Sequence, residues 1–193
     1  MPAIQYSPGV RHDLEEILLT ETQIQRRLDE LGKEMERDYA GRDLTMIAVL
    51  TGSVLFAADL LRRLPLQVRL DCLGISSYHG QTRSSGEVTV TKSLHLDVRD
   101  REVLVVDDIL DTGLTLVRIR EMLGKLGPRS LKFAVFLEKE VPHHENFRAD
   151  YVAFRIPNKF VVGYGLDYLE RYRNLPYVGT LKPSVYESHG SAL

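Results

Sequence analysis

Tryptophan is absent from this sequence, and cysteine occurs only once, at Cys72. A single cysteine excludes an internal disulfide, and its position in an alternating apolar stretch predicts a buried core residue and not a nucleophile. No apolar run approaches the roughly 20 residues that a membrane-spanning helix needs. The sequence does not begin with basic residues followed by an apolar core, so no signal peptide is predicted. We therefore expect a cytoplasmic protein that does not bind membranes.

A surplus of either charge is also missing, since 27 acidic residues stand against 25 basic ones for a formal net charge of −2. A near-neutral balance argues against a generic nucleic-acid partner. What is present is an ordinary globular composition, 44% hydrophobic and 27% charged, in a chain long enough to bury its own core. With no repeat and no linker visible, we expect one domain over residues 1–193, with residues 1–19 as a flexible arm.

The apolar pattern predicts strands and helices that alternate through the middle of the chain. Residues 20–37 read as an amphipathic helix, in which Thr20 and Gln23 have capping-box spacing. Further helices are expected at 54–64 and 115–126, and strands at 44–50, 66–72, 87–94, 103–106, 131–137, 151–154, 160–163 and 177–180. This alternation predicts an α/β fold with a mainly parallel central sheet flanked by helices.

The strongest chemical signal is the stretch 103–115. Four apolar residues run into Asp107 and Asp108, and Asp111-Thr112-Gly113 follows just before a predicted helix. Ligands of open α/β sheets bind beyond the carboxyl ends of strands, and a helix start with free N–H groups suits a phosphate. One aspartate here would be read as a turn cap, but three in five positions favour a functional site.

Acidic groups beside a phosphate need a partner, because like charges repel. Carboxylates accept hydrogen bonds from sugar hydroxyls, and they also hold Mg²⁺ that bridges to phosphates. The stretch therefore predicts a phosphorylated sugar with free hydroxyls. It is not a P-loop, because G-x-x-x-x-G-K-[ST] is absent, and Gly163-Tyr164-Gly165 lacks the third glycine of a dinucleotide-binding fingerprint.

Other segments allow two interpretations each. Thr51-Gly52 forms a second strand-to-helix turn, which suits either another phosphate or a plain helix cap. Lys139, just past a predicted strand, is either a donor to a base oxygen or a surface lysine, and Phe160 either stacks on a flat base or lies in the core. The adjacent histidines at 143 and 144 are interpreted as surface residues without a metal site.

Stretch 103–115 resembles the phosphoribosyl-diphosphate (PRPP) binding motif of the type I phosphoribosyltransferases. The wider chain, from about Leu44 to Tyr177, resembles the hypoxanthine-guanine phosphoribosyltransferases. The resemblance implies a type I phosphoribosyltransferase-like fold with a small hood and a mobile lid loop over residues 76–87. It also implies Mg²⁺ as cofactor, a homodimer or homotetramer, and a purine-salvage reaction. In that reaction PRPP and hypoxanthine or guanine give IMP or GMP and pyrophosphate.

The resemblance also implies residue roles on the PRPP side. The residues that contact ribose or its 5-phosphate are Asp107, Asp108, Asp111, Thr112, Gly113, Leu114 and Thr115. Those that bind pyrophosphate are Leu50, Thr51, Gly52 and Arg173. A basic residue is common in the family where Thr51 stands here, so we expect backbone contacts alone from that position.

On the purine side, the resemblance assigns base-binding roles to Lys139, Phe160, Val161 and Asp167. Asp111 is the candidate general base toward the imidazole ring of the purine, so that N9 can attack. Asp167 and Asp107 are the candidate metal ligands, and Ser77 and Tyr78 open the lid. Two alternatives stay open: a phosphoribosyltransferase that also accepts xanthine, and an RNA-binding regulator built on the same fold.

Overall fold

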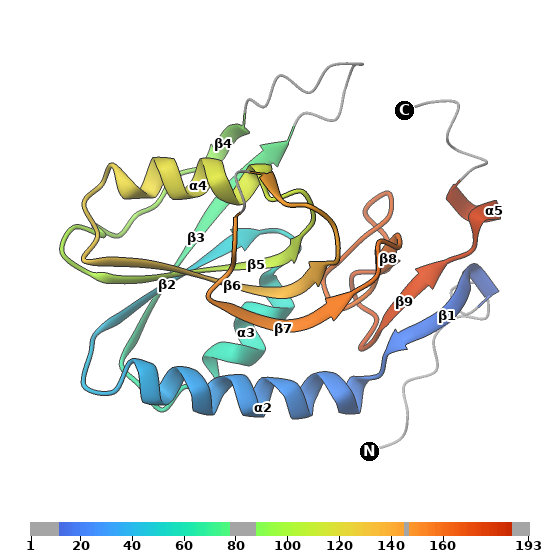
Figure 1. Ribbon diagram of the computed structural model, residues 1–193, viewed down its shortest axis with the longest axis horizontal. Coiled ribbons are helices and arrows are strands. Elements are labelled where there is room, and N and C mark those ends of the chain that lie inside the picture. Colours follow the sequence, from blue (N-terminus) through green and yellow to red (C-terminus); the bar gives the residue numbers. More distant parts are fainter. Residues whose placement is uncertain (1–11, 78–87, 145–146, 187–193) are drawn as a thin grey trace.

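The computed structural model describes residues 12–77, 88–144 and 147–186. Its main sheet has the strand order β4-β3-β2-β5-β6-β7, in which only β4 runs antiparallel to its neighbour (Figure 1). The strands are β2 (Leu44–Leu50), β3 (Val68–Ser77), β4 (Val88–Lys92), β5 (Glu102–Leu110), β6 (Ser130–Lys139) and β7 (Tyr151–Ile156). This arrangement confirms the predicted mainly parallel sheet.

Helices cover both faces of this sheet. Helix α4 (Leu114–Gly124) lies on one face, and α2 (Glu21–Asp38) and α3 (Val54–Leu61) lie on the other (Figure 1). Strand β5 is buried on both sides: Val103 and Val105 pack in the cluster that contains α4, whereas Leu104 and Val106 pack toward α2 and α3. A strand with two covered faces is apolar throughout, which explains the unbroken run before the aspartates.

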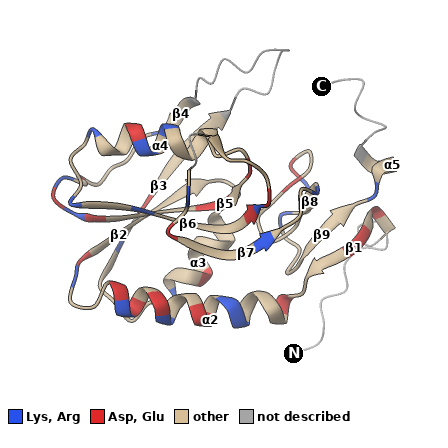
Figure 2. Ribbon diagram, viewed as in Figure 1, with Lys and Arg blue, Asp and Glu red and all other residues tan. Residues whose placement is uncertain are grey.

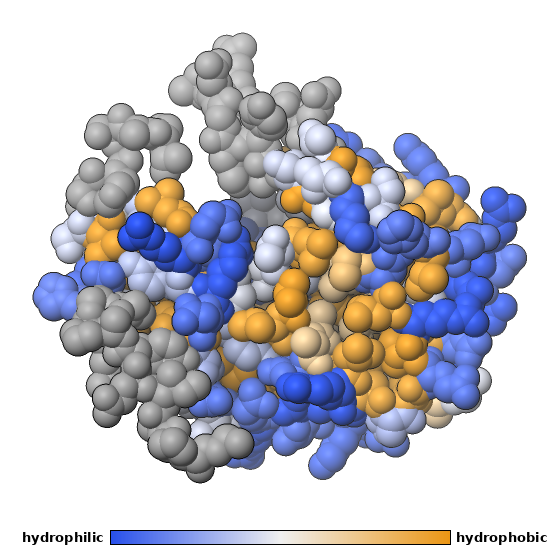
Figure 3. Space-filling model, turned by 180° about the vertical axis from the view of Figure 1, so that it is seen from behind, coloured by the Kyte–Doolittle hydropathy of each residue, from blue (hydrophilic) through white to orange (hydrophobic). Residues whose placement is uncertain are grey.

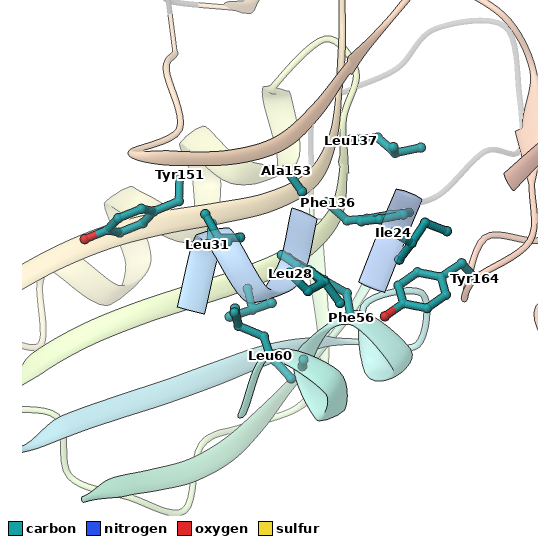
Figure 4. Packing of buried hydrophobic residues seen from close by; sticks show 14 of the residues in the cluster. Ile24, Leu28, Leu31, Phe56, Leu60, Phe136, Leu137, Tyr151, Ala153 and Tyr164 are labelled. Carbon is teal, nitrogen blue, oxygen red and sulfur yellow. The ribbon is translucent and has the colours of Figure 1, made fainter. Parts of the chain in front are cut away.

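Helix α2 begins at the predicted capping box. The Thr20 hydroxyl accepts the N–H of Gln23, and the Gln23 side chain accepts the N–H of Thr20. The helix buries one stripe, including Ile24 and Leu28, against Phe56 of α3 and Phe136 of β6 (Figure 4). Deleting one such buried leucine or isoleucine typically costs about 2–5 kcal/mol of stability. Burial of this stripe fixes α3, and with α3 the loop that precedes it.

The order of the sheet reverses between β2 and β5. The chain leaves β2 through α3 to reach β3 on one side, whereas β5, β6 and β7 extend from the other side of β2. Crevices at such reversals, outside the carboxyl ends of the strands, are where open α/β sheets bind ligands. The ends of β2 and β5 carry the two predicted phosphate loops, so the topology brings both to one place.

A second, three-stranded sheet forms the hood, with the order β1-β9-β8. It consists of β1 (Leu14–Leu19), β8 (Val161–Val162) and β9 (Val178–Leu181), with the short helix α5 (Pro183–Tyr186) after it. The prediction of a flexible arm over residues 1–19 is therefore wrong for residues 14–19, which pair with β9. Pattern reasoning missed β1 because its sequence LEEILL has no clean alternation.

Several predicted boundaries also change. Strand β5 continues to Leu110 and β6 to Lys139, so Asp107, Asp108 and Lys139 lie inside the strands and not after them. Helix α3 ends at Leu61, before the predicted limit at 64. Cys72 is half-buried, not fully buried. Of the predicted lid, residues 76 and 77 end β3, and 78–87 lie outside the described residues.

The surface combines mixed charges with scattered apolar side chains. Acidic and basic residues alternate along α2 and around the loops at the amino ends of the strands (Figure 2). On the face of the molecule turned away from the viewer in Figure 1, apolar residues gather near the middle (Figure 3). Large exposed side chains on α3, β3 and β4 are Val54, Leu55, Leu70 and Val90. Within the described ranges, none of the helices combines the length and the apolar character that crossing a bilayer requires.

Candidate active site

The loop from β5 to α4, which we call the phosphate cradle, leads into the start of a helix. Gly113 is the residue before the helix and has a φ of +84°, a conformation that glycine adopts without strain. In the described part of the chain no side chain caps the start of α4. Its first N–H groups are therefore available to a ligand, together with the positive end of the helix dipole. Leu114 and Thr115, predicted to bind the 5-phosphate, form the first turn.

Asp107 and Asp108 form a buried acidic pair. Asp107 is only 7% exposed, Asp108 is half-buried, and the Asp107 carboxylate accepts the N–H of Asp108 at 3.0 Å. Burial, followed by the neighbouring Asp108, raises the pKa of Asp107 well above its usual range, and burial also raises the pKa of Asp108. Among the described residues no lysine or arginine forms an ion pair with either. The pair is therefore suited to hydrogen-bond donors or a cation supplied by a ligand.

Gly52 lies directly against Asp108. A Cβ on Gly52 would stand 1.7 Å from Asp108 Oδ2, so a larger residue there would force the Asp108 carboxylate to move. The neighbouring Leu50–Thr51 peptide is cis, and the Thr51 side chain is exposed. Ser53 does not cap α3 with its side chain, because its buried hydroxyl donates to the Val49 carbonyl at 2.6 Å. The 50–52 loop therefore offers a ligand backbone groups and no charged side chain.

The turn after β8 brings the hood to the same loop. Gly165 has a φ of +102°, and a Cβ there would stand 2.0 Å from the Gly52 carbonyl oxygen. Arg173 holds this turn twice: its carbonyl accepts the N–H of Gly165, and its guanidinium donates to the Gly165 carbonyl, both at 2.9 Å. Residues 50–52 and 163–173, far apart in the sequence, therefore share one wall of the site.

Asp167 and Arg173 pair in this wall. Arg173 Nη2 lies 2.9 Å from Asp167 Oδ1, and the other Asp167 oxygen accepts the N–H of Glu170 at 2.9 Å. No group of three His, Cys, Asp or Glu side chains that could enclose a metal occurs within residues 12–77, 88–144 and 147–186. Magnesium, however, is usually held by one or two carboxylates together with substrate phosphates. The unpaired acidic couple at 107–108 and the partly exposed Asp167 fit that pattern.

Asp111 and Lys139 meet across the ends of β5 and β6. Lys139 Nζ lies 2.9 Å from Asp111 Oδ2, and the Lys139 side chain is only 12% exposed, against 50% for Asp111. The interpretation of Lys139 as a plain surface lysine is therefore wrong. An exposed carboxylate next to a largely buried ammonium gives an acceptor and a donor side by side at the open edge of the site.

Phe160 stands at the start of the hood strand β8. The residue is 46% exposed and its ring meets that of Tyr168 edge-on, with 5.6 Å between centroids, so the alternative of a core residue is excluded. The next residue, Val161, is buried and pairs with Thr180 of β9. Lys159 forms an ion pair with Glu16 of β1. An exposed aromatic face on a fixed strand is suited to stack against a flat ligand.

Two residues of this region escaped the sequence interpretation. His143, expected on the surface, has a side chain only 12% exposed and contacts the Asp111 carbonyl, so that expectation is wrong; His144 is exposed as expected. Tyr164 packs on Phe136 at 4.7 Å (Figure 4), and its hydroxyl donates to Asp59 of α3 at 2.6 Å. Burial and this hydrogen bond raise the pKa of Tyr164 above its usual range. Neither contact joins residues that are close in sequence.

The lid residues are placed only in part. Ser77 ends β3 beside the site-facing ends of the strands, and Tyr78 lies outside the described residues.

Comparisons with known proteins agree over nearly the whole chain. The family described as phosphoribosyl transferase domain matches residues 16–169. A hypoxanthine-guanine phosphoribosyltransferase of Staphylococcus aureus is 45% identical over 93% of this chain and 100% of its own length. One from Bacillus subtilis is 43% identical over 93% and 99%. A crystal structure of a Staphylococcus aureus hypoxanthine phosphoribosyltransferase superimposes with a TM-score of 0.90, at 44% identity over 94% and 99% of the two chains.

Proposed function

The chain belongs to the phosphoribosyl transferase domain family, and we propose on that premise that it makes purine nucleotides from PRPP. It transfers the 5-phosphoribosyl group to N9 of a 6-oxopurine, hypoxanthine or guanine, and releases pyrophosphate. The observation that carries this function is the juxtaposition of the acidic pair Asp107 and Asp108, for which the described residues supply no ion pair, with a helix start at Leu114 that no described side chain caps. The first suits ribose hydroxyls and the second suits the 5-phosphate.

The PRPP side of the reaction uses backbone donors. Thr112, Gly113, Leu114 and Thr115 hold the 5-phosphate, and the 50–52 loop with Arg173 holds the pyrophosphate. As the bond from the anomeric carbon to the pyrophosphate oxygen breaks, negative charge grows on the leaving group. Preorganised N–H groups and a guanidinium stabilise such charge without reorganising. The contact of Gly165 with Gly52 supports this role, because it fixes the loop before substrate binds.

Asp111 acts as the general base. It takes or holds the proton on the imidazole side of the purine, so that N9 attacks the cation-like anomeric carbon. Its exposed carboxylate supports this role, because a buried one would not reach a substrate. Lys139, 2.9 Å away, donates to the 6-oxo group of the base, while Phe160 stacks on its face and the Val161 backbone bonds its edge.

Magnesium fits the acidic groups present. Asp167 and Asp107 would hold the ion through their carboxylates. When bound, the ion neutralises charge on the departing pyrophosphate. Arg173, paired with Asp167 at 2.9 Å, keeps that carboxylate oriented.

We extend two further proposals to the intact protein. It works in the cytoplasm, and it assembles as a homodimer or homotetramer. Exposed apolar side chains on α3, β3 and β4 support self-association, because such groups commonly mark interfaces (Figure 3). Light scattering after size-exclusion chromatography measures the assembly, and a monomer at micromolar concentration contradicts it.

The activity is tested by supplying PRPP and Mg²⁺ with hypoxanthine, guanine, xanthine or adenine in separate reactions and detecting the nucleotide. We expect IMP and GMP, and no AMP. Formation of XMP at a comparable rate extends the acceptors to xanthine. Absence of product with every base refutes the enzymatic function, and salt-dependent binding of RNA in that case supports the regulator alternative.

A further inference from the structure

The chain after β6 folds back over the loop that carries Asp111. The N–H of His144 donates to the Thr112 carbonyl at 2.5 Å. A Cβ on Gly113 would meet the Cβ atoms of Phe147 and His143 at 3.4 and 3.7 Å. The 5-phosphate loop therefore has a ligand-facing side and a side that His143, His144 and Phe147 cover.

His143 makes the most specific contact of this covering segment. Its Nδ1 lies 2.7 Å from the main-chain oxygen of Asp111. A carbonyl oxygen can only accept a hydrogen bond, so Nδ1 carries the proton in this contact. The imidazole is thus a donor aimed at the backbone of the proposed general base.

The other side of the imidazole is held by the sheet. Its Nε2 lies 3.4 Å from Glu138 Oε1 on β6, and Arg155 of β7 lies 2.8 Å from the second oxygen of Glu138. The side chains of His143 and Glu138 are 12% and 14% exposed. A largely buried ring between the Asp111 carbonyl and the Glu138 carboxylate is restricted in orientation, which is the requirement for fixing a third group.

Asp111 is consequently held at two points. Lys139 contacts its carboxylate at 2.9 Å, and His143 contacts its carbonyl at 2.7 Å. The Lys139 contact competes with the purine, because the same ammonium donates to the base in the proposed reaction. The His143 contact reaches only the main chain and does not compete.

We propose that His143 is a positioning residue for Asp111: it fixes the Asp111 main chain so that the carboxylate keeps its direction when Lys139 turns to the purine. Glu138 orients the imidazole for this purpose. The inference rests on the proposed role of Asp111 as general base, and it assigns no contact between His143 and the substrate.

The test compares three variants by single-turnover kinetics, which isolate the chemical step from product release. His143→Ala removes the donor, whereas His143→Asn offers an amide N–H near the place of Nδ1. His144→Ala is the matched control, since that side chain is exposed and its main-chain bond to Thr112 persists. We expect a roughly 2- to 10-fold slower step for His143→Ala, the effect of one hydrogen bond. His143→Asn should recover part of that rate, His144→Ala should match the parent protein, and the KM for PRPP should stay within about twofold.

The decisive measurement repeats His143→Ala in an Asp111→Asn background. If His143 acts through Asp111, adding His143→Ala to the Asp111→Asn protein slows the chemical step by less than about twofold. The side chain at position 111 no longer takes the proton there, so its orientation has little effect on the rate. Equal slowing in both backgrounds shows a merely structural role and overturns the inference. Thermal unfolding accompanies each variant, and His143→Asn replaces His143→Ala in the cycle if the alanine protein does not fold.

The two assignments fail separately. An Asp111→Asn protein with unchanged turnover refutes the general base, whatever His143 does. A slow Asp111→Asn protein together with His143→Ala and His143→Asn proteins of parental rate refutes the positioning role alone.

Discussion

Gly165 of the hood turn lies against the carbonyl oxygen of Gly52, so closely that a Cβ on Gly165 would stand 2.0 Å from that oxygen. The two glycines lie in turns that follow strands of different sheets, β2 and β8, and are more than a hundred residues apart in sequence. Gly52 also makes room for the Asp108 side chain, because a Cβ on Gly52 would stand only 1.7 Å from Asp108 Oδ2. The pyrophosphate loop is therefore clamped between the acidic pair and the hood, and its position depends on the absence of two side chains.

Gly165→Ala should impair both stability and catalysis. The new methyl group must push the 50–52 loop away, and the alanine backbone must adopt a left-handed conformation. Together these effects should lower the free energy of unfolding by about 2–4 kcal/mol. A shifted loop should lower kcat/KM for PRPP by roughly tenfold or more. Gly41→Ala is the control, because Gly41 has a φ of +72° but no atom within 4 Å of its Cβ position. If Gly41→Ala is equally slow, the close contact is not the cause.

Asp111→Asn should separate binding from chemistry. The amide keeps the size and hydrogen-bonding oxygen of the side chain but cannot take a proton, so turnover should fall by roughly 10²–10⁴. The affinity for PRPP should remain close to that of the parent protein. Steady-state kinetics and PRPP titration by calorimetry measure the two quantities. Unchanged turnover contradicts the assignment of the base.

Asp107→Asn should stabilise the protein while weakening PRPP binding. The folded state raises the pKa of Asp107, so the unfolded chain releases its proton more readily, and the parent loses stability as pH rises through that raised pKa. Without substrate and with EDTA, the variant should have the higher Tm at neutral pH, and the difference should disappear in acid. Its affinity for PRPP should fall by roughly tenfold, since an amide is a weaker acceptor for ribose hydroxyls. A Tm difference that is the same at pH 4 and pH 8 would argue against this electrostatic origin.

Asp71→Asn should expose a different electrostatic dependence. Asp71 of β3 is buried and accepts the N–H groups of His95 and Leu96 at 2.6 and 2.9 Å, and Lys92 adds an ammonium at 3.2 Å. Burial alone raises the pKa of this carboxyl, but the backbone N–H donors and Lys92 outweigh it and lower the pKa to about 2. The substitution should cost about 1–3 kcal/mol at neutral pH.

The pH dependence of this loss of stability follows from the direction of the pKa shift of Asp71. Because the folded pKa of Asp71 lies below the unfolded value, its contribution is complete above about pH 4 and is lost as pH falls toward 2. Urea unfolding across this range should show the variant and the parent converging in acid. Asp43→Asn, at an exposed carboxylate, serves as the control and should leave the curve unchanged. Parallel curves for Asp71→Asn and the parent would exclude Asp71 as the source.

The sequence predicted the strand and the helix on either side of the 103–115 turn because they are local. Residues 103–115 form one strand, one turn and one helix start, so the acidic pair and the phosphate cradle follow from neighbouring residues. The parallel sheet was predicted from the alternation of strands and helices along the chain. What could not be predicted joins distant residues: Gly165 with Gly52, His143 with Asp111, and Tyr164 with Asp59. A glycine or histidine carries no local pattern that names its partner, and β1 lacked alternation because it is a short edge strand.

The pairing of β1 with β9 has a consequence for the order in which the site forms. Leu14 pairs with Leu181, and Leu19 with Val178, so the hood closes a loop of about 160 residues. Contacts of such long sequence separation are the slowest to form, whereas β2, β5 and α4 are close together along the chain. On a ribosome the phosphate cradle is therefore assembled first, and the surface bearing Phe160 is completed only after Leu181 has emerged. A nascent chain should therefore form the surface proposed to bind the sugar phosphate before the surface proposed to bind the purine.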